Sequence, residues 1–123
     1  MIVKTTVKAS GYNVSLTPEL LFYRGDVVFI EFTLFNSLIK SINGVRVEEM
    51  LPLNELSDVK LKIETPEGVD LIESTQIIEN KAKFKMNISN TIGVYKFQIV
   101  CYDNDGCVCH LPPCTYSIAD TIG

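Results

Sequence analysis

The feature that most constrains this chain is a strict alternation of apolar and charged side chains. It is clearest in residues 81–88, KAKFKMNI, and in residues 59–65, VKLKIET. Successive side chains of a β-strand point to opposite faces, so a repeat of two predicts strands with one buried and one solvated face. An amphipathic helix would repeat every 3.6 residues, and no segment keeps that repeat over three turns. The chain is therefore predicted to be built from β-sheets.

Other segments extend the same pattern. Residues 93–103 place Tyr95, Phe97 and Ile99 on one face, and the turn sequence that follows, 103–106 (DNDG), predicts a hairpin with a returning strand. Shorter strands are expected at residues 2–8, 12–16, 69–73 and 75–78. Seven to nine short strands without a helix predict an all-β fold, an immunoglobulin-like two-sheet β-sandwich formed as a single domain over residues 1–123.

One strand, predicted at residues 26–35, is apolar on both faces. One face carries Val28, Ile30, Phe32 and Leu34, which we expect in the core. On the other face, Val27, Phe29 and Phe35 are the candidate interface residues. They are expected to be covered either by the segment 37–56 or by a partner chain, because an exposed apolar sheet face is a liability for a monomer and an asset in an assembly.

The segment 37–56 is the least determined part of the sequence. Residues 38–42 fit a strand end or a short helix, Asn43-Gly44 is a turn, and residues 45–51 fit a strand or one helical turn. We expect a long connection with some local order. Such a connection is uncommon inside a compact domain and therefore invites a functional interpretation.

Composition and charge argue against several classes of function. The net charge is −4 and only two arginines are present, so a basic groove for nucleic acid is not expected. The longest apolar run, residues 27–35, is far shorter than the roughly 20 residues of a membrane span. The first residues show neither a basic flank nor an apolar leader, so we expect an unprocessed intracellular product.

Four cysteines lie within fourteen residues. Cys107, Cys109, His110 and Cys114 are of the right types for a zinc site, but their spacing differs from the familiar motifs. Reduced thiols that pack as small apolar side chains are the favoured interpretation, and no cofactor is predicted. A two-residue turn at 104–105 would place Cys101 on the opposite face from Cys107 and Cys109, which forbids a bridge to either. A Cys109–Cys114 bridge is geometrically open, although an intracellular protein would keep it reduced.

No enzymatic function is predicted. His110 is the only histidine, and its neighbour Cys109 would point to the other side of the same strand, so the two cannot form a dyad. An alternative function is a carbohydrate- or ligand-binding sandwich that uses Tyr12, Tyr23, Tyr95 or Tyr102 as a stacking surface. A third, a Cys/His zinc-binding structural module, would rest on the residues named above.

Several segments, taken in order, resemble the N-terminal immunoglobulin-like domain of phage baseplate upper proteins. The similarity covers approximately residues 20–118. It rests on FYRGD at 22–26 before the apolar strand, on residues 56–68 with their Pro-x-Gly turn, on the lysine-alternating strand and on the Gly-x-Tyr strand entry at 93–95.

This resemblance implies a structural role in a phage or prophage tail. The chain would anchor a receptor-binding or tail-fibre component to the baseplate through protein–protein contacts, in several copies around the tail. Its partners would be other baseplate proteins and further copies of itself, and its location would be the virion, assembled in the host cytoplasm. No nucleic acid and no membrane span are part of this expectation.

Overall fold

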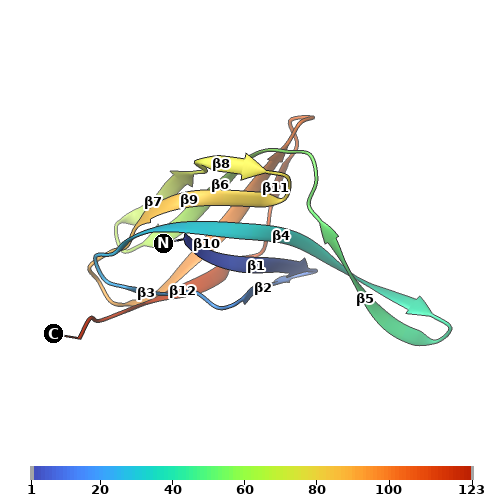
Figure 1. The fold of residues 1–123 in the computed structure, drawn as a ribbon, viewed down its shortest axis with the longest axis horizontal. Helices are drawn as coiled ribbons and strands as arrows, with labels where there is room; N and C mark the ends of the chain where they lie inside the picture. Colours follow the sequence, from blue (N-terminus) through green and yellow to red (C-terminus); the bar gives the residue numbers. More distant parts are fainter. Residues whose placement is uncertain (1, 123) are drawn as a thin grey trace.

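The computed structural model describes residues 2–122, and these form two β-sheets packed face to face (Figure 1). The predicted all-β, two-sheet sandwich is confirmed. Within the described residues no helix is present, so none could cross a membrane. Sheet A has the order β2 (Asn13–Thr17), β1 (Ile2–Ser10), β4 (Val27–Ile42), β9 (Lys81–Asn87) and β8 (Gln76–Ile78), with β5 (Val45–Pro52) also paired to β4. Sheet B has the order β3 (Leu21–Tyr23), β12 (Cys114–Ala119), β10 (Gly93–Asp103), β6 (Leu56–Thr65) and β7 (Gly68–Glu73), with β11 (Val108–His110) paired to β10.

The core lies between the sheets and is made by the alternation seen in the sequence. In β4, Ile30, Phe32 and Leu34 are almost wholly buried, and the alternate residues of β9, β6 and β10 meet them. Phe32 packs edge to face on Phe84 with ring centroids 5.8 Å apart, and its centroid lies 6.0 Å from that of Phe97. Aromatic pairs in such tilted geometries add to the stabilisation from apolar burial. The two sheets are therefore held together by side chains that the period-two pattern predicts to be inside.

Twelve strands are present among residues 2–122, where the sequence pattern predicts seven to nine. β3 and β11 have three residues each, too few for a repeat of two to be seen. β12 is separated from β11 by Pro112-Pro113 and carries mostly polar residues on its outer side. These strands form because a neighbouring strand already offers them a hydrogen-bonding edge, which sequence periodicity does not report.

The register of the β10–β11 hairpin differs from the prediction. The loop has three residues rather than two: the N–H of Asp103 donates to the carbonyl of Cys107 at 3.1 Å, and Gly106 has a φ of +83°. The Asp103 carboxylate accepts from the N–H groups of Asp105 and Cys107, both at 2.9 Å, which fixes this wider turn. One extra loop residue shifts every pair by one and reverses the faces. Cys101 is therefore paired with Cys109, on the same face, and the predicted separation of these two thiols is wrong.

Candidate interaction surfaces

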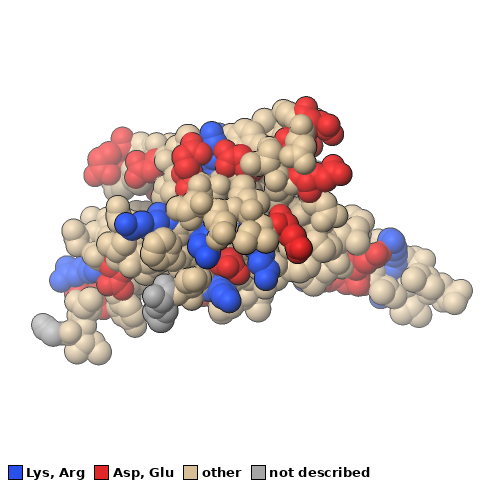
Figure 2. Space-filling model, turned by 45° about the horizontal axis from the view of Figure 1, so that its top comes forward, with Lys and Arg blue, Asp and Glu red and all other residues tan. Residues whose placement is uncertain are grey.

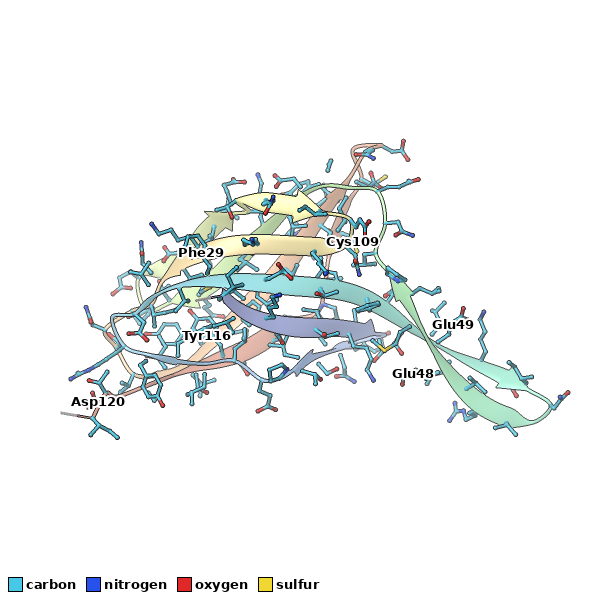
Figure 3. The ribbon with its side chains drawn as sticks, viewed as in Figure 1. Phe29, Glu48, Glu49, Cys109, Tyr116 and Asp120 are labelled. Carbon is cyan, nitrogen blue, oxygen red and sulfur yellow. The ribbon has the colours of Figure 1, made fainter. Side chains whose placement is uncertain are left out.

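The candidate interface residues of β4 lie on the outer face of sheet A. Val27 is 59% exposed and Phe29 is 40% exposed, while Phe35 is half-buried. Phe29 lies between Ile2 of β1 and Lys85 of β9 in the strand register (Figure 3). The expectation that the segment 37–56 could cover this face is wrong, because that segment leaves the sandwich. The aromatic ring of Phe29 is consequently open to solvent in the middle of a sheet face.

Lysines surround this apolar patch. Within the three strands β1, β9 and the part of β4 from Val27 to Phe35, the outward positions carry five lysines and a single acid, Glu31. Figure 2 shows Lys and Arg side chains spread over the middle of the molecule, with many of the Asp and Glu side chains along its upper margin. We call this surface the lysine face; its members are Lys4, Lys8, Val27, Phe29, Glu31, Phe35, Lys81, Lys83 and Lys85.

The lysine face is electrostatically unbalanced. Glu31 lies opposite Lys4 on one side and Lys83 on the other, beside a hollow of about 240 Å³. Of its five lysines, Lys8 alone makes an ion pair among residues 2–122, with Glu48 at 3.0 Å. The period-two pattern predicts Lys81, Lys83 and Lys85 only as the solvated face of one strand. The parallel pairing of β1 with β4, which no local pattern reveals, is what brings two further lysines to the same surface.

The second surface is a two-stranded arm. β4 continues past the sandwich to Ile42, turns at Asn43-Gly44 and returns as β5, so that residues 37–52 project from one end of the molecule (Figure 1). The turn residues have φ values of +52° and +77°, as a two-residue hairpin turn requires, and the ambiguous segment is therefore strand on both sides. We call residues 37–52 the arm.

The arm exposes apolar side chains on both of its faces. On the face that continues the inside of the sandwich, five large apolar residues are between 39% and 62% exposed: Leu38, Ile42, Val45, Val47 and Leu51. On the opposite face Ile39 is 63% and Met50 is 42% exposed. The tip around the turn has no charged residue, as Figure 2 also shows at the far right. Exposed apolar side chains grouped in this way make the arm a candidate interaction surface.

The base of the arm is fixed where β4 changes partner. Up to Thr33 it pairs with β9, and from Phe35 onward it pairs with β5. At the junction the carbonyl of Leu34 accepts from the N–H of Leu53 at 3.1 Å and from the Asn80 side-chain amide at 3.0 Å. Asn80 is buried, so surrounding residues restrict the position of this side-chain amide. The arm thus begins at a hydrogen-bonded junction with the sandwich.

The cysteines and the histidine do not converge on one point. A cavity of about 200 Å³ lies between the β10–β11 hairpin and the residues that flank the base of the arm. It is lined by Cys101, Cys107 and Cys109. His110 points to the other face, where its Nε2 lies 3.2 Å from Lys62 Nζ, and Cys114 belongs to β12 beside the core. The four residues of the hypothetical zinc site are therefore not brought together. Among residues 2–122 no group of three or more potential ligands is arranged to hold a metal ion.

The thiols themselves differ in environment. All four cysteines are unbridged, with Cys107 and Cys109 exposed. Burial raises the pKa of the Cys101 thiol to about 12, and its neighbour Cys109 adds to that shift. Burial also raises the pKa of Cys114 to about 12. These two side chains consequently stay protonated and pack as small apolar groups.

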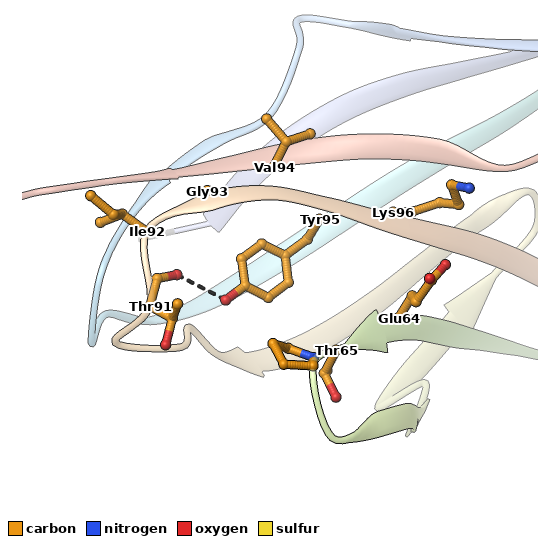
Figure 4. A pocket seen from close by; sticks show the side chains of 9 residues that line it. Glu64, Thr65, Thr91, Ile92, Gly93, Val94, Tyr95 and Lys96 are labelled. Carbon is orange, nitrogen blue, oxygen red and sulfur yellow. Dashed lines mark hydrogen bonds between the residues drawn. The ribbon is translucent and has the colours of Figure 1, made fainter.

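The four candidate stacking tyrosines lie in different places. Tyr12 is fully exposed in the β1–β2 turn, Tyr23 ends β3, and Tyr102 lies on the outside of sheet B with Lys60 Nζ 5.1 Å from its ring centroid. Tyr95 adjoins an open groove of about 450 Å³, shown in Figure 4. Its ring stacks on Tyr116 and its hydroxyl donates to the Thr91 carbonyl at 2.8 Å, so it is only 8% exposed. The groove therefore offers no free aromatic face.

Comparison of the sequence with protein-family models finds no match, and comparison with curated proteins finds none either. The similarity to baseplate upper proteins stays a prediction that these comparisons do not test. The lysine face and the arm are the two candidate interaction surfaces of the described residues.

Proposed function

We propose that this chain is a non-enzymatic structural module of a phage or prophage tail baseplate. It anchors a receptor-binding or tail-fibre component through protein–protein contacts, in several copies, within a virion assembled in the host cytoplasm. The observation that carries the proposal is Phe29, an aromatic side chain that is 40% exposed on a face with four lysines that make no ion pair within residues 2–122. Buried aromatic anchors inside a charged rim supply most of the energy of many protein interfaces.

The charge of the lysine face specifies the partner. The chain as a whole is acidic, with a net charge of −4, yet this face is basic. A partner with an acidic surface is attracted to it, whereas the acidic remainder of the molecule repels the same partner. Complementary potentials of this kind fix orientation and speed association more than they raise affinity. The docking component is therefore expected to be a protein with an acidic patch around an apolar cavity that accepts Phe29.

The experiment is co-purification of the full chain with each tail protein encoded beside it. Phe29→Ser and Lys83→Glu are expected to weaken capture of the partner, and higher salt is expected to weaken it further because exposed charges are screened. Val94→Ser and Lys96→Glu are the matched controls, since both residues lie on the outward side of β10 in the opposite sheet. Lys83→Glu changes an outward side chain and keeps the test valid if Phe29→Ser lowers stability.

A chain that captures none of these proteins would contradict the proposed function. Equal loss of binding in the control variants would contradict the assignment to the lysine face. Specific binding on a glycan array by the wild-type chain would favour the carbohydrate-binding alternative instead.

A further inference from the structure

The arm carries a free sheet edge along β5. Among residues 2–122, β5 pairs with β4 and with no other strand. In a two-residue hairpin the pair beside the turn exchanges both hydrogen bonds, and bonded and non-bonded pairs alternate from there. The Leu53 N–H to Leu34 carbonyl bond at 3.1 Å continues this alternation to the base of the arm. The N–H and C=O groups of Arg46, Glu48 and Met50 therefore point outward, with no partner strand.

The free edge ends at Pro52, which has no backbone N–H to donate. Pro52 occupies the next outward position, and a proline there loses no ladder hydrogen bond because its missing N–H would point to solvent. Proteins normally avoid long exposed edge strands: such strands are kept short, covered by another segment or protected by inward-pointing charges. Here the edge is eight residues long, uncovered and flanked by exposed Val45, Val47 and Leu51.

We infer that the partner of this edge is a second copy of the chain, paired antiparallel along β5 with the two-fold axis through Val47. This inference deepens the proposed assembly role, on which it rests, by naming the occupant of the arm. In this register Arg46 of one copy lies directly opposite Glu48 of the other, and the symmetry repeats the pair. Opposite charges on directly facing residues stabilise an antiparallel pair. The two copies of Val47 meet at the axis.

Charge selects this register over its neighbours. A two-fold axis normal to the sheet keeps equivalent faces on the same side, so only registers centred on a residue are symmetric. Centring on Glu48 would place that carboxylate opposite its own copy, which is unfavourable. Centring on Glu49 would oppose Glu48 to Met50 and Arg46 to Pro52, with no ion pair and one donor fewer.

The ion pairs within one copy are consistent with the same register. Lys8 pairs with Glu48 and Lys40 pairs with Glu49, whereas Arg46 has no ion-pair partner among residues 2–122. A carboxylate accepts several hydrogen bonds, so Glu48 can bind Lys8 of its own copy and Arg46 of the other. Arg46 is then the one charged residue of the arm that gains its ion-pair partner from the second copy.

The other free edges are less suited to self-pairing. β7 carries Asp70 and Glu73 without a base, so its own copy would repel it. The part of β4 within the arm carries Lys40 as its only charged residue. The remaining edge strands of the described chain are short, at most five residues: β2, β3, β8 and β11.

The shape and charge of the molecule also permit the contact. The arm has two bases and two acids, so all of the net charge of −4 lies on the rest of the chain. Pairing through neutral arms that project from the sandwich lets the two acidic bodies stay apart (Figure 1). Repulsion between exposed charges fades over a Debye length of roughly 10 Å.

Sedimentation equilibrium of the full chain over a range of concentrations tests the inference. The wild-type chain is expected to form a dimer, and Arg46→Glu and Glu48→Arg are each expected to weaken it about tenfold or more, since each reversal opposes like charges twice. The double variant Arg46→Glu/Glu48→Arg restores the opposite charges and is expected to recover the dimer. Lys96→Glu, outside the arm, is the matched control and should leave the dimer unchanged.

Three results would overturn the inference: a wild-type chain that stays monomeric, single reversals that dimerise as well as the wild type, or a double variant that fails to recover. The Arg46 and Glu48 variants change exposed side chains of the arm, and Lys96→Glu changes an exposed side chain of β10, so unchanged thermal unfolding verifies that the sandwich is intact. Failure here is distinguishable from failure of the proposed function. Lys83→Glu is expected to lose the baseplate partner while it keeps the dimer, and Arg46→Glu to do the reverse.

Discussion

The two halves of β4 are one continuous strand in two environments. From Val27 to Leu34 it crosses the sandwich, and its inward side chains are covered by sheet B, with Phe32 only 1% exposed. From Ser37 to Ile42 the strand continues, but among residues 2–122 no second sheet lies opposite, and Leu38 and Ile42 on the same face are 43% and 54% exposed. Strand formation therefore depends on local sequence and pairing, whereas burial depends on what lies across from the strand.

This difference separates the stability of the molecule from its interactions. Sandwich residues contribute to the free energy of unfolding because they leave water when the chain folds. Most arm residues stay exposed after folding, so they contribute little to the free energy of unfolding. Their apolar surface can leave water only when a partner binds. Substitutions chosen in matched pairs, one in each region, can sharpen or break this contrast.

The largest effect is expected at Phe32. Phe32→Ala removes a buried ring that packs on Phe84 and Phe97, and should lower the free energy of unfolding by about 3–5 kcal/mol through lost burial and a residual cavity. Ile39→Ala in the arm should change it by no more than about 0.5 kcal/mol. Urea denaturation of both variants measures the two values. Comparable losses in the two variants would contradict the separation of sandwich from arm.

A smaller contrast is expected between two glycines that have the same positive φ. Gly25 and Gly44 both have a φ of +77°, but a Cβ at Gly25 would lie 2.9 Å from the Asn90 side-chain oxygen, while one at Gly44 meets nothing within 4 Å. Gly25→Ala should cost about 1–3 kcal/mol of global stability. Gly44→Ala should leave the melting temperature nearly unchanged and raise hydrogen exchange only in the arm. A large fall in melting temperature for Gly44→Ala would show that the arm folds cooperatively with the sandwich.

The junction between the regions should respond more weakly. Asn80→Ala removes the amide that donates to the Leu34 carbonyl, although the Leu53 N–H still satisfies that carbonyl. A loss of about 1 kcal/mol is expected, the usual net value of one hydrogen bond. Amides at the base of the arm should exchange faster than in the wild type. Unchanged exchange there would mean that Asn80 does not position the arm.

High pH should destabilise the sandwich gradually, with a small effect near pH 9 that grows toward pH 12. Burial raises the pKa of Cys101, Cys114 and Tyr116 to about 12 from ordinary values of 9.0, 9.0 and 10.0. The unfolded chain therefore loses these protons first, and folding becomes less favourable as pH rises through this window. Thermal unfolding measured between pH 8 and pH 12 tests the expectation. The Cys101→Ala/Cys114→Ala variant should show a shallower decline, and an identical slope would refute the assignment.

Much of the sandwich is predictable from the chain itself. The buried residues of β6, β9 and β10 follow the period-two pattern, and Asn43-Gly44 forms the turn that its sequence predicts. The sequence predicts the position of the hairpin after Asp103 correctly, but the two-residue loop that it predicts is wrong. The loop length depends on the Asp103 carboxylate, which accepts hydrogen bonds from two N–H groups. The free-energy difference between a two-residue and a three-residue loop is too small for sequence patterns to resolve.

The candidate surfaces were only half predictable. Val27, Phe29 and Phe35 are predictable as an outward apolar group because they interrupt the polar side of an otherwise alternating strand, and their role as an interface stays a prediction. The lysine face was not found, since Lys4 and Lys8 join it through the parallel pairing of β1 with β4, a contact between segments about 27 residues apart in the chain. Non-local pairing of this kind leaves no local signature.

The sequence by itself determined the alternation of apolar and charged side chains. It therefore also determined that the chain forms strands with one apolar face and one charged face. The tertiary structure alone decided which strands became neighbours, and within residues 2–122 it left the arm without a sheet to cover it. The physical reason is that alternation is set by the pleat of each strand, whereas neighbours are set by the packing of the whole chain around one core.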